Sequence, residues 1–255
     1  MIRCSKFAVP FTFRDALRQI HASALWSHPT AMLWQRCLSI DSQFCHAVVT
    51  AGYLSWEQMV NAACRYCLGM TKNHGVIFWQ IDQEGRVHDG KVMYYGADCH
   101  RLKDKQHTPT WVSHLLARRH HLPRLSNASS SHCLFGLHLL SEESEEFVIA
   151  VVEAEKSAVI LSEHYPQYVW LAAGGLGELQ PDKFRPLRGR KVILFPDTDP
   201  DGIAFRRWYD VAQQVMQQPF WEGSPPIRVS PILEQKATPE QKQRKIDIVD
   251  ILFAP

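Results

Sequence analysis

Apolar residues in the first third of the chain recur at helical spacing. This pattern predicts helices over residues 14–25 and 30–51. Ser55 and Gln58 are placed to form a capping box at the start of a third helix, which Gly69 would end.

The period changes to that of extended strands over residues 75–105. The runs GVIFWQID and VHDGKVMYYG predict antiparallel strands, because apolar and aromatic residues there are interrupted by turn residues. The expected turn signals are Gly85 and the pair Asp89-Gly90. The sequence therefore predicts a helical region followed by a small antiparallel β region.

Three short apolar runs follow between residues 147 and 202: FVIAVVEAEKSAVIL, YVWLAAGGLGEL and RKVILFPDTDPDG. Such runs, alternating with a helical pattern, are typical of buried parallel strands. We therefore predict an α/β fold, with a mostly parallel sheet flanked by helices. Polar or small residues follow the three runs, namely Glu153, then Gly174 and Gly175, then Asp197, Asp199 and Asp201.

The remaining C-terminal residues predict a helix over 203–218 and a fourth strand over 227–233. The polar segment 234–245 is expected to be a solvated surface segment. A last helical turn would bury three apolar side chains, Ile248, Ile251 and Leu252.

The acidic residues that follow the strands suggest a metal site. Ligands of open α/β sheets bind at the carboxyl ends of the strands, and carboxylates crowded there repel one another. Oxygen ligands favour Mg²⁺ or Mn²⁺, which leave coordination positions for water and phosphate. We therefore expect Glu153, Asp197, Asp199 and Asp201 to bind magnesium or manganese.

Three other interpretations compete for the acidic loop and the glycines. The segment 197–202 could be a polar turn with a helix cap, although Glu153 on another strand favours a site. An EF-hand calcium loop fails, because its twelfth position is Trp208 instead of glutamate. A dinucleotide-binding loop at 174–177 lacks the GxGxxG spacing.

VVEAEKSA followed by VILFPDTDPDG resembles the toprim domain of primases, topoisomerases and related nucleases. The resemblance covers about the last 110 residues. It places Glu153 on the toprim glutamate, a general acid or base, and Asp197 and Asp199 on the metal-binding DxD pair. Lys156 keeps the basic position of the run EGEKDA found in primase-type members. The ending KIDIVDILF resembles their KDxNDxL tail through Asp247 and Asp250. The runs IFWQID, DGKVMYY and CLFGLHLL resemble the small β element that precedes toprim in primase-like proteins of bacterial mobile elements.

The composition suits a globular protein with no membrane segment. Apolar residues make up 45% of the 255 positions, yet no run of eighteen apolar residues occurs. The N-terminus has too short an apolar stretch for a signal peptide. The seven cysteines are therefore expected to be reduced thiols of a cytoplasmic protein.

Charge is uneven along the chain. Residues 1–125 contain 15 Lys and Arg against 8 Asp and Glu, and the remainder contains 13 against 18. We expect domains at 1–131 and 141–255, separated by SNASSS. The basic first part predicts nucleic-acid binding, although a solvated face remains an alternative. Its candidate residues are Lys91, Arg101, Arg118, Arg119 and Arg124.

The preferred function is a primase-type nucleotidyltransferase that uses metal-assisted phosphoryl transfer in the replication or transfer of a mobile element. Glu153 and Lys156 are its candidate catalytic residues. Single-stranded DNA or RNA would be its partner, with a replicative helicase or relaxase as a protein partner. The alternatives are a toprim nuclease and a non-catalytic toprim relic that binds nucleic acid or a partner protein. A topoisomerase would need a strand-passage domain for which the chain lacks room.

Overall fold

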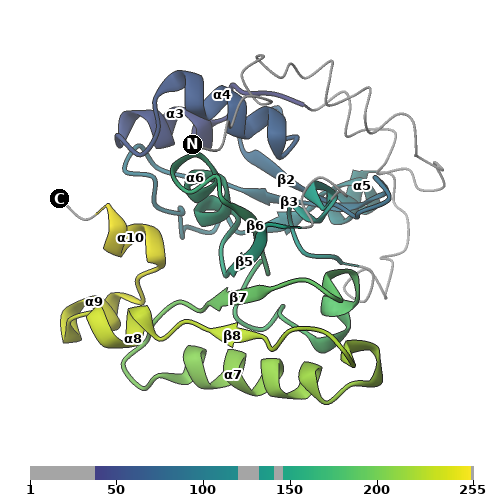
Figure 1. The fold of residues 1–255 in the computed structure, drawn as a ribbon. Helices are drawn as coiled ribbons and strands as arrows, with labels where there is room; N and C mark the ends of the chain where they lie inside the picture. Colours follow the sequence, from purple (N-terminus) through teal and green to yellow (C-terminus); the bar gives the residue numbers. More distant parts are fainter. Residues whose placement is uncertain (1–37, 120–131, 141–145, 254–255) are drawn as a thin grey trace, which may run out of the picture. The chain divides into compact units, whose positions relative to one another are not determined.

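The computed structural model describes residues 38–119, 132–140 and 146–253, which fall into two compact units. The first unit ends at Cys133 and the second begins at Leu134. Figure 1 shows the helices and strands of both units. Within the described residues, none of the helices is both long and apolar enough to span a membrane.

Two helices of the first unit begin at serine caps. α3 (Gln43–Thr50) starts after Ser42, whose side chain accepts a hydrogen bond from the backbone of Cys45. α4 (Trp56–Arg65) starts with the predicted capping box of Ser55 and Gln58. The predicted helix 30–51 is wrong over residues 38–41, which are not helical. The predicted helix 14–25 lies outside the described residues.

The sheet of the first unit has the order β1-β2-β3-β4, and its pairs are antiparallel. Its strands are β1 (Gly69–Met70), β2 (Val76–Ile81), β3 (Val87–Met93) and β4 (Thr110–Trp111), and α5 (Val112–Arg119) follows directly. All six residues of β2 are buried. One face of β2 contributes Ile77 and Trp79 to a core that includes Val112 at the start of α5. Gly69 therefore begins a strand instead of ending the preceding helix.

The predicted turn at Asp89-Gly90 is also wrong, because both residues lie inside β3. Gly90 pairs with Trp79 across the sheet. A Cβ on Gly90 would come within 2.6 Å of Ile77 and 2.7 Å of the Trp79 ring. Glycine is required there by packing against these side chains and not by a turn.

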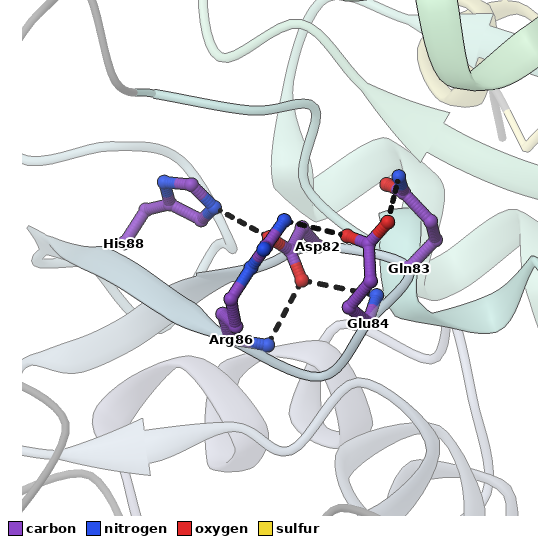
Figure 2. A network of polar contacts seen from close by, with 5 residues as sticks. All are labelled: Asp82, Gln83, Glu84, Arg86 and His88. Carbon is purple, nitrogen blue, oxygen red and sulfur yellow. Dashed lines mark hydrogen bonds and ion pairs between the residues drawn. The ribbon is translucent and has the colours of Figure 1, made fainter. Parts of the chain in front are cut away.

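The turn between β2 and β3 is held by Asp82 (Figure 2). Its Oδ1 accepts hydrogen bonds from the backbone of Glu84 and Arg86, and its Oδ2 contacts Arg86 Nε at 2.7 Å and His88 Nε2 at 2.9 Å. Burial would raise the pKa of Asp82, but the bonds to His88 and Arg86 outweigh it and the pKa is lowered. Gly85 supplies the left-handed residue, with a φ of 77°. This network confirms the predicted hairpin.

The sheet of the second unit is parallel and has the order β6-β5-β7-β8. Its strands are β5 (Val148–Val152), β6 (Tyr168–Ala172), β7 (Val192–Phe195) and β8 (Arg228–Val229). The chain passes from β5 to β6 on one side of β5 and then to β7 on its other side. The strand order therefore reverses between β5 and β7, which makes this the topological switch point of the sheet.

Helices connect and flank these strands, as the α/β prediction requires. α6 (Glu155–His164) packs on β5 and β6, α7 (Ile203–Met216) packs on β8, and α10 (Ile248–Leu252) packs on α6. The segment expected to be a solvated surface forms two short helices, α8 (Ile232–Lys236) and α9 (Pro239–Arg244). The fourth strand is consequently shorter than predicted. The described residues of this unit also contain 3-10 helices at η2 (Leu137–Leu139), η4 (Pro181–Leu187) and η5 (Pro219–Trp221).

The segment CLFGLHLL contributes to the second sheet. Phe135 forms an antiparallel bridge with Ala172 at the end of β6, with N···O distances of 2.9 and 3.1 Å. Phe135 and the neighbouring Leu134 are fully buried. Phe135 thus adds one antiparallel bridge at the β6 edge of the parallel sheet, before the 3-10 helix η2 begins.

Candidate functional site

Three strand ends of the second unit lie in register. Val152, the last residue of β5, pairs with Ala172 of β6 on one side and Phe195 of β7 on the other. Glu153 follows β5 at once, and Asp197 comes two residues after β7. The sequence prediction that these acids share one end of the sheet is therefore confirmed by the strand pairing. They lie at the switch point, where open α/β sheets bind their ligands.

A glycine loop follows β6 at the same end. The backbone N–H of Gly174 donates to the carbonyl of Glu153 at 2.9 Å, which ties this loop to the residue after β5. Gly174 and Gly175 have φ angles of 90° and 148°, a region that residues with a Cβ rarely occupy. Both glycines are needed to turn the chain close to Glu153.

Asp197 is the most strongly perturbed acid of this site. Removal from water raises its pKa well above the usual value, and the charges of Glu153, Asp247 and Asp250 raise it further. Lys156 acts in the opposite direction. The charges of three other carboxylates and of Lys156 therefore act on Asp197. Perturbed acids of this kind cluster at functional sites.

Lys156 and the C-terminal segment are joined by a buried polar cluster. Lys156 Nζ lies 3.4 Å from Asp247 Oδ2, and both side chains are only about a tenth exposed. The same Asp247 oxygen accepts a hydrogen bond from Ser157 Oγ at 2.7 Å. Asp247 also forms a capping box with Asp250 that begins α10. The tail acids noted in the sequence thus anchor α10 beside the basic residue of the candidate site.

The loop after β7 is also held by the C-terminal segment. The backbone N–H of Thr198 donates to the carbonyl of Ile246 at 3.2 Å. Thr198 Oγ1 donates to Glu234 at 2.8 Å, and Lys242 pairs with the other oxygen of Glu234 at 2.7 Å. Residues beyond β8 therefore fix the position of the loop that carries Asp197 and Asp199. No motif in the sequence singled out Thr198 or Glu234.

Asp199 is engaged by the start of α7. Its Oδ1 accepts from the backbone N–H groups of Asp201 and Ile203, and its Oδ2 accepts from Ala204 at 2.7 Å. The residue at the helix cap, Gly202, has no side chain that could accept hydrogen bonds from these N–H groups. Burial would raise the pKa of Asp199, but these backbone hydrogen bonds outweigh it and the pKa is lowered. Asp199 therefore stabilises the helix that follows the acidic loop.

We expect Asp199→Ala to destabilise the fold by about 1 kcal/mol, the usual effect of losing a helix cap. Because the pKa is lowered in the folded state, the contribution of Asp199 is present above the unfolded pKa of about 3.9 and lost as the pH falls through the folded value. Urea unfolding of wild type and variant at pH 7 and below pH 4 measures this. Equal stability of the two proteins at pH 7 would contradict the capping role.

The donor chemistry of the site suits a hard divalent cation. Glu153 and Asp197 offer oxygen ligands, and one or two carboxylates suffice for Mg²⁺ when water and phosphate complete its coordination. Over the described ranges, no three His, Cys, Asp or Glu side chains are grouped closely enough to enclose a metal ion. The expected trio of Glu153, Asp197 and Asp199 is therefore not preassembled. The exposed Asp201 lies in the turn before α7. The assignment of these four residues to a metal stays a prediction.

The candidate nucleic-acid contacts of the first unit come from several elements. Lys91 is half-buried in β3, where it pairs with Phe78 and Trp111. Arg101 is exposed and forms a bridge with Tyr95. The two exposed arginines Arg118 and Arg119 end α5. The fifth candidate, Arg124, lies outside the described residues. Exposure favours the arginines over Lys91 for contacts to phosphate.

Fold and site together define an α/β protein whose parallel sheet carries two acidic residues, Glu153 and Asp197, at its switch point. Residues 42–198 match the model of a family described as a domain of unknown function, DUF6371. Since the match covers more than half of the chain, the chain belongs to this family. The match includes Glu153, Lys156 and Asp197 but ends before Asp199 and the C-terminal cluster. No curated protein matches the sequence.

Among solved structures, the chain is similar to the primase fragment of the bacteriophage T7 primase-helicase protein. That alignment has 18% identity and a TM-score of 0.39 and covers 66% of this chain. It spans only 60% of the T7 fragment. A second similarity is to a structure of bacteriophage T7 lagging-strand DNA polymerase interacting with primase domains bound to an RNA/DNA hybrid and dTTP. It has 16% identity and a TM-score of 0.42 and covers 72% of this chain and 75% of the other.

Proposed function

We propose that this protein is a nucleic-acid enzyme of primase type that joins nucleotides by metal-assisted phosphoryl transfer. One observation carries the proposal: Glu153 and Asp197 follow adjacent parallel strands at the switch point, and their charges are coupled. A crevice that collects carboxylates in this way suits a cation that binds phosphate. The toprim resemblance supports the same reaction. We also propose that the enzyme acts in the replication or transfer of a mobile element.

In this reaction Asp197 and Glu153 would hold magnesium, which polarises the phosphate and offsets its charge when bound. The hydroxyl oxygen of a growing strand attacks the α-phosphorus of a nucleoside triphosphate, and the bond from that phosphorus to pyrophosphate breaks. Glu153 is the candidate base that takes the hydroxyl proton. Lys156 supplies positive charge beside the carboxylates. Asp199 keeps the acidic loop attached to α7.

A second candidate function is a non-catalytic toprim relic that binds nucleic acid or a partner protein. The hydrogen bonds of Asp199 favour it, because both carboxylate oxygens already serve the backbone of α7. The same acids could also hydrolyse a phosphodiester, with water in place of the hydroxyl. A replicative helicase or relaxase is the protein partner that the primase proposal implies.

One assay separates these functions. The full chain is incubated with single-stranded DNA, labelled ribonucleotides and Mg²⁺ or Mn²⁺. The template and any new strand are then resolved on a gel. New labelled oligonucleotides identify synthesis, shortened template identifies a nuclease, and a gel shift without either product identifies a binding protein. Glu153→Gln should eliminate either reaction while the strand is still bound. Product formed equally by this variant would overturn the site assignment.

We expect the binding of single strands to depend steeply on salt if Arg118 and Arg119 contact phosphates. Each neutralised phosphate adds about −0.7 to the slope of log affinity against log salt. The double variant Arg118→Ala with Arg119→Ala should therefore flatten the slope by roughly one to two units, without changing base preference. Fluorescence anisotropy across a salt series measures this. The control replaces Lys236 and Arg244, two exposed cations of the second unit, by alanine. Equal slopes in wild type and double variant would make the arginines a solvated face.

A further inference from the structure

An arginine of α7 lies against the glycine loop of the candidate site. A Cβ placed on Gly177 would be 3.4 Å from Nη2 of Arg207, at the short end of van der Waals contact. The guanidinium therefore lies next to the loop at Gly177. Gly177 lies three residues beyond Gly174, whose N–H is bonded to the carbonyl of Glu153. The guanidinium therefore lies beside the loop that is hydrogen-bonded to the residue after β5.

Arg207 has charge available for a ligand. It is exposed, and within the described part of the chain no carboxylate forms an ion pair with it. The acid of the neighbouring loop, Glu178, pairs with Lys183 at 3.6 Å. Arginine carries a planar fork of donors that matches the oxygens of a phosphate group. A positive fork beside the loop next to Glu153 complements a ligand that brings both phosphate and a bound cation.

α7 holds this arginine at a fixed distance from the acidic loop. The helix starts where Asp199 accepts the N–H groups of Ile203 and Ala204. Arg207 stands one helical turn after Ile203. Loop and arginine are thus positioned by the same helix start, which keeps the guanidinium at the end of the sheet where Glu153 and Asp197 emerge.

We propose that Arg207 binds a phosphate group of the substrate at the rim formed by Gly177 and α7. The proposal rests on the proposed function and adds a phosphate-binding residue to the same site. The phosphate comes either from a nucleoside triphosphate or from the backbone of a nucleic acid. Both present the same oxygens to the guanidinium, so the two sources are separated by experiment.

Arg206 provides a matched control. It is the next exposed arginine of the same helix, so its replacement changes the charge equally. Its Nη1 lies 3.5 Å from the position of a Cβ on Gly202, where Glu234 is also close at 3.8 Å. Arg206 therefore faces the start of α7 and the C-terminal segment, while Arg207 faces the loop after β6.

The test compares Arg207→Gln and Arg206→Gln in equilibrium binding, with ATP as one probe and a single-stranded oligonucleotide as the other, both with Mg²⁺. Arg207→Gln should weaken the affinity for one probe about tenfold or more, and that probe identifies the phosphate source. Arg206→Gln should change either affinity less than twofold. Arg207→Lys should recover only part of the loss, because lysine keeps the charge without the fork.

Equal effects of the two glutamine variants, or wild-type protein that binds neither probe, would overturn the proposal. Binding is measured without turnover, so the result is independent of the reaction. If the wild-type protein makes no product but Arg207→Gln still weakens binding, the result would support this inference and contradict the proposed function. If the wild-type protein makes product and Arg207→Gln binds both probes as tightly as wild type, the proposed function is supported and this inference is contradicted. The melting temperature of each variant checks that the exposed substitutions leave the fold intact.

Discussion

Asp197→Asn should abolish phosphoryl transfer together with the rise in melting temperature produced by Mg²⁺ or Mn²⁺. The variant removes the charged oxygen that the cation needs, and we expect activity to fall at least about 100-fold, as when one group that stabilises the transition state is lost. In wild type, a cation at about 100 times its Kd would stabilise the folded state by about 2.7 kcal/mol. Thermal melts with and without metal, paired with the gel assay, measure both effects.

Asp210→Asn is the control for this prediction, because Asp210 is an exposed acid of α7 and its loss changes net charge equally. It should keep both the activity and the metal-dependent shift. If Asp197→Asn also keeps the shift, the cation binds elsewhere.

The metal-free protein offers an independent measurement on Asp197. Its pKa is raised by burial and by the charges of Glu153, Asp247 and Asp250. The folded state therefore retains a proton that the unfolded chain releases. Stability should fall as the pH rises from the unfolded pKa of about 3.9 through the raised folded value. Asp197→Asn cannot ionise, so its stability should decrease less over this interval in urea titrations without metal.

Features that depend on local pattern could be predicted from the sequence. The apolar runs gave β5, β6 and β7, and the register of parallel strands then brings Glu153 and Asp197 to one end of the sheet. The capping box of Ser55 is likewise a local motif, and it is present. Strand and cap assignments depend on neighbours within a few residues, which the sequence displays directly.

Features that depend on distant partners could not be predicted in this way. Gly90 looks like a turn residue until Trp79 is placed against it across the sheet. Thr198 depends on Glu234, thirty-six residues away. In each instance tertiary contacts determine the role, and no spacing along the chain reveals them.

Asp247→Ala should cause the largest loss of stability among these variants. Asp247 is buried against Lys156 at 3.4 Å and accepts the Ser157 hydroxyl at 2.7 Å. Removal of one partner leaves a buried ammonium group without its carboxylate, which typically costs about 3–5 kcal/mol. The variant also loses the cap of α10. Urea unfolding at constant pH measures the loss. A change below about 1 kcal/mol would mean that the pair resembles an exposed ion pair.

A double-mutant cycle separates the ion pair from the cap. Asp247→Asn removes the charge and keeps one acceptor oxygen for the Asp250 N–H that caps α10, while its amide N–H can donate to the Ser157 hydroxyl oxygen. Lys156→Met removes the opposite charge while retaining an unbranched apolar side chain. Each single variant should be strongly destabilised. The double variant should be more stable than the sum of the two losses predicts, because the second substitution no longer removes the counterpart of a buried charge in this pair. Additive losses would show that Lys156 and Asp247 do not stabilise each other. Asp247 would then act through the Ser157 hydrogen bond and the α10 cap alone.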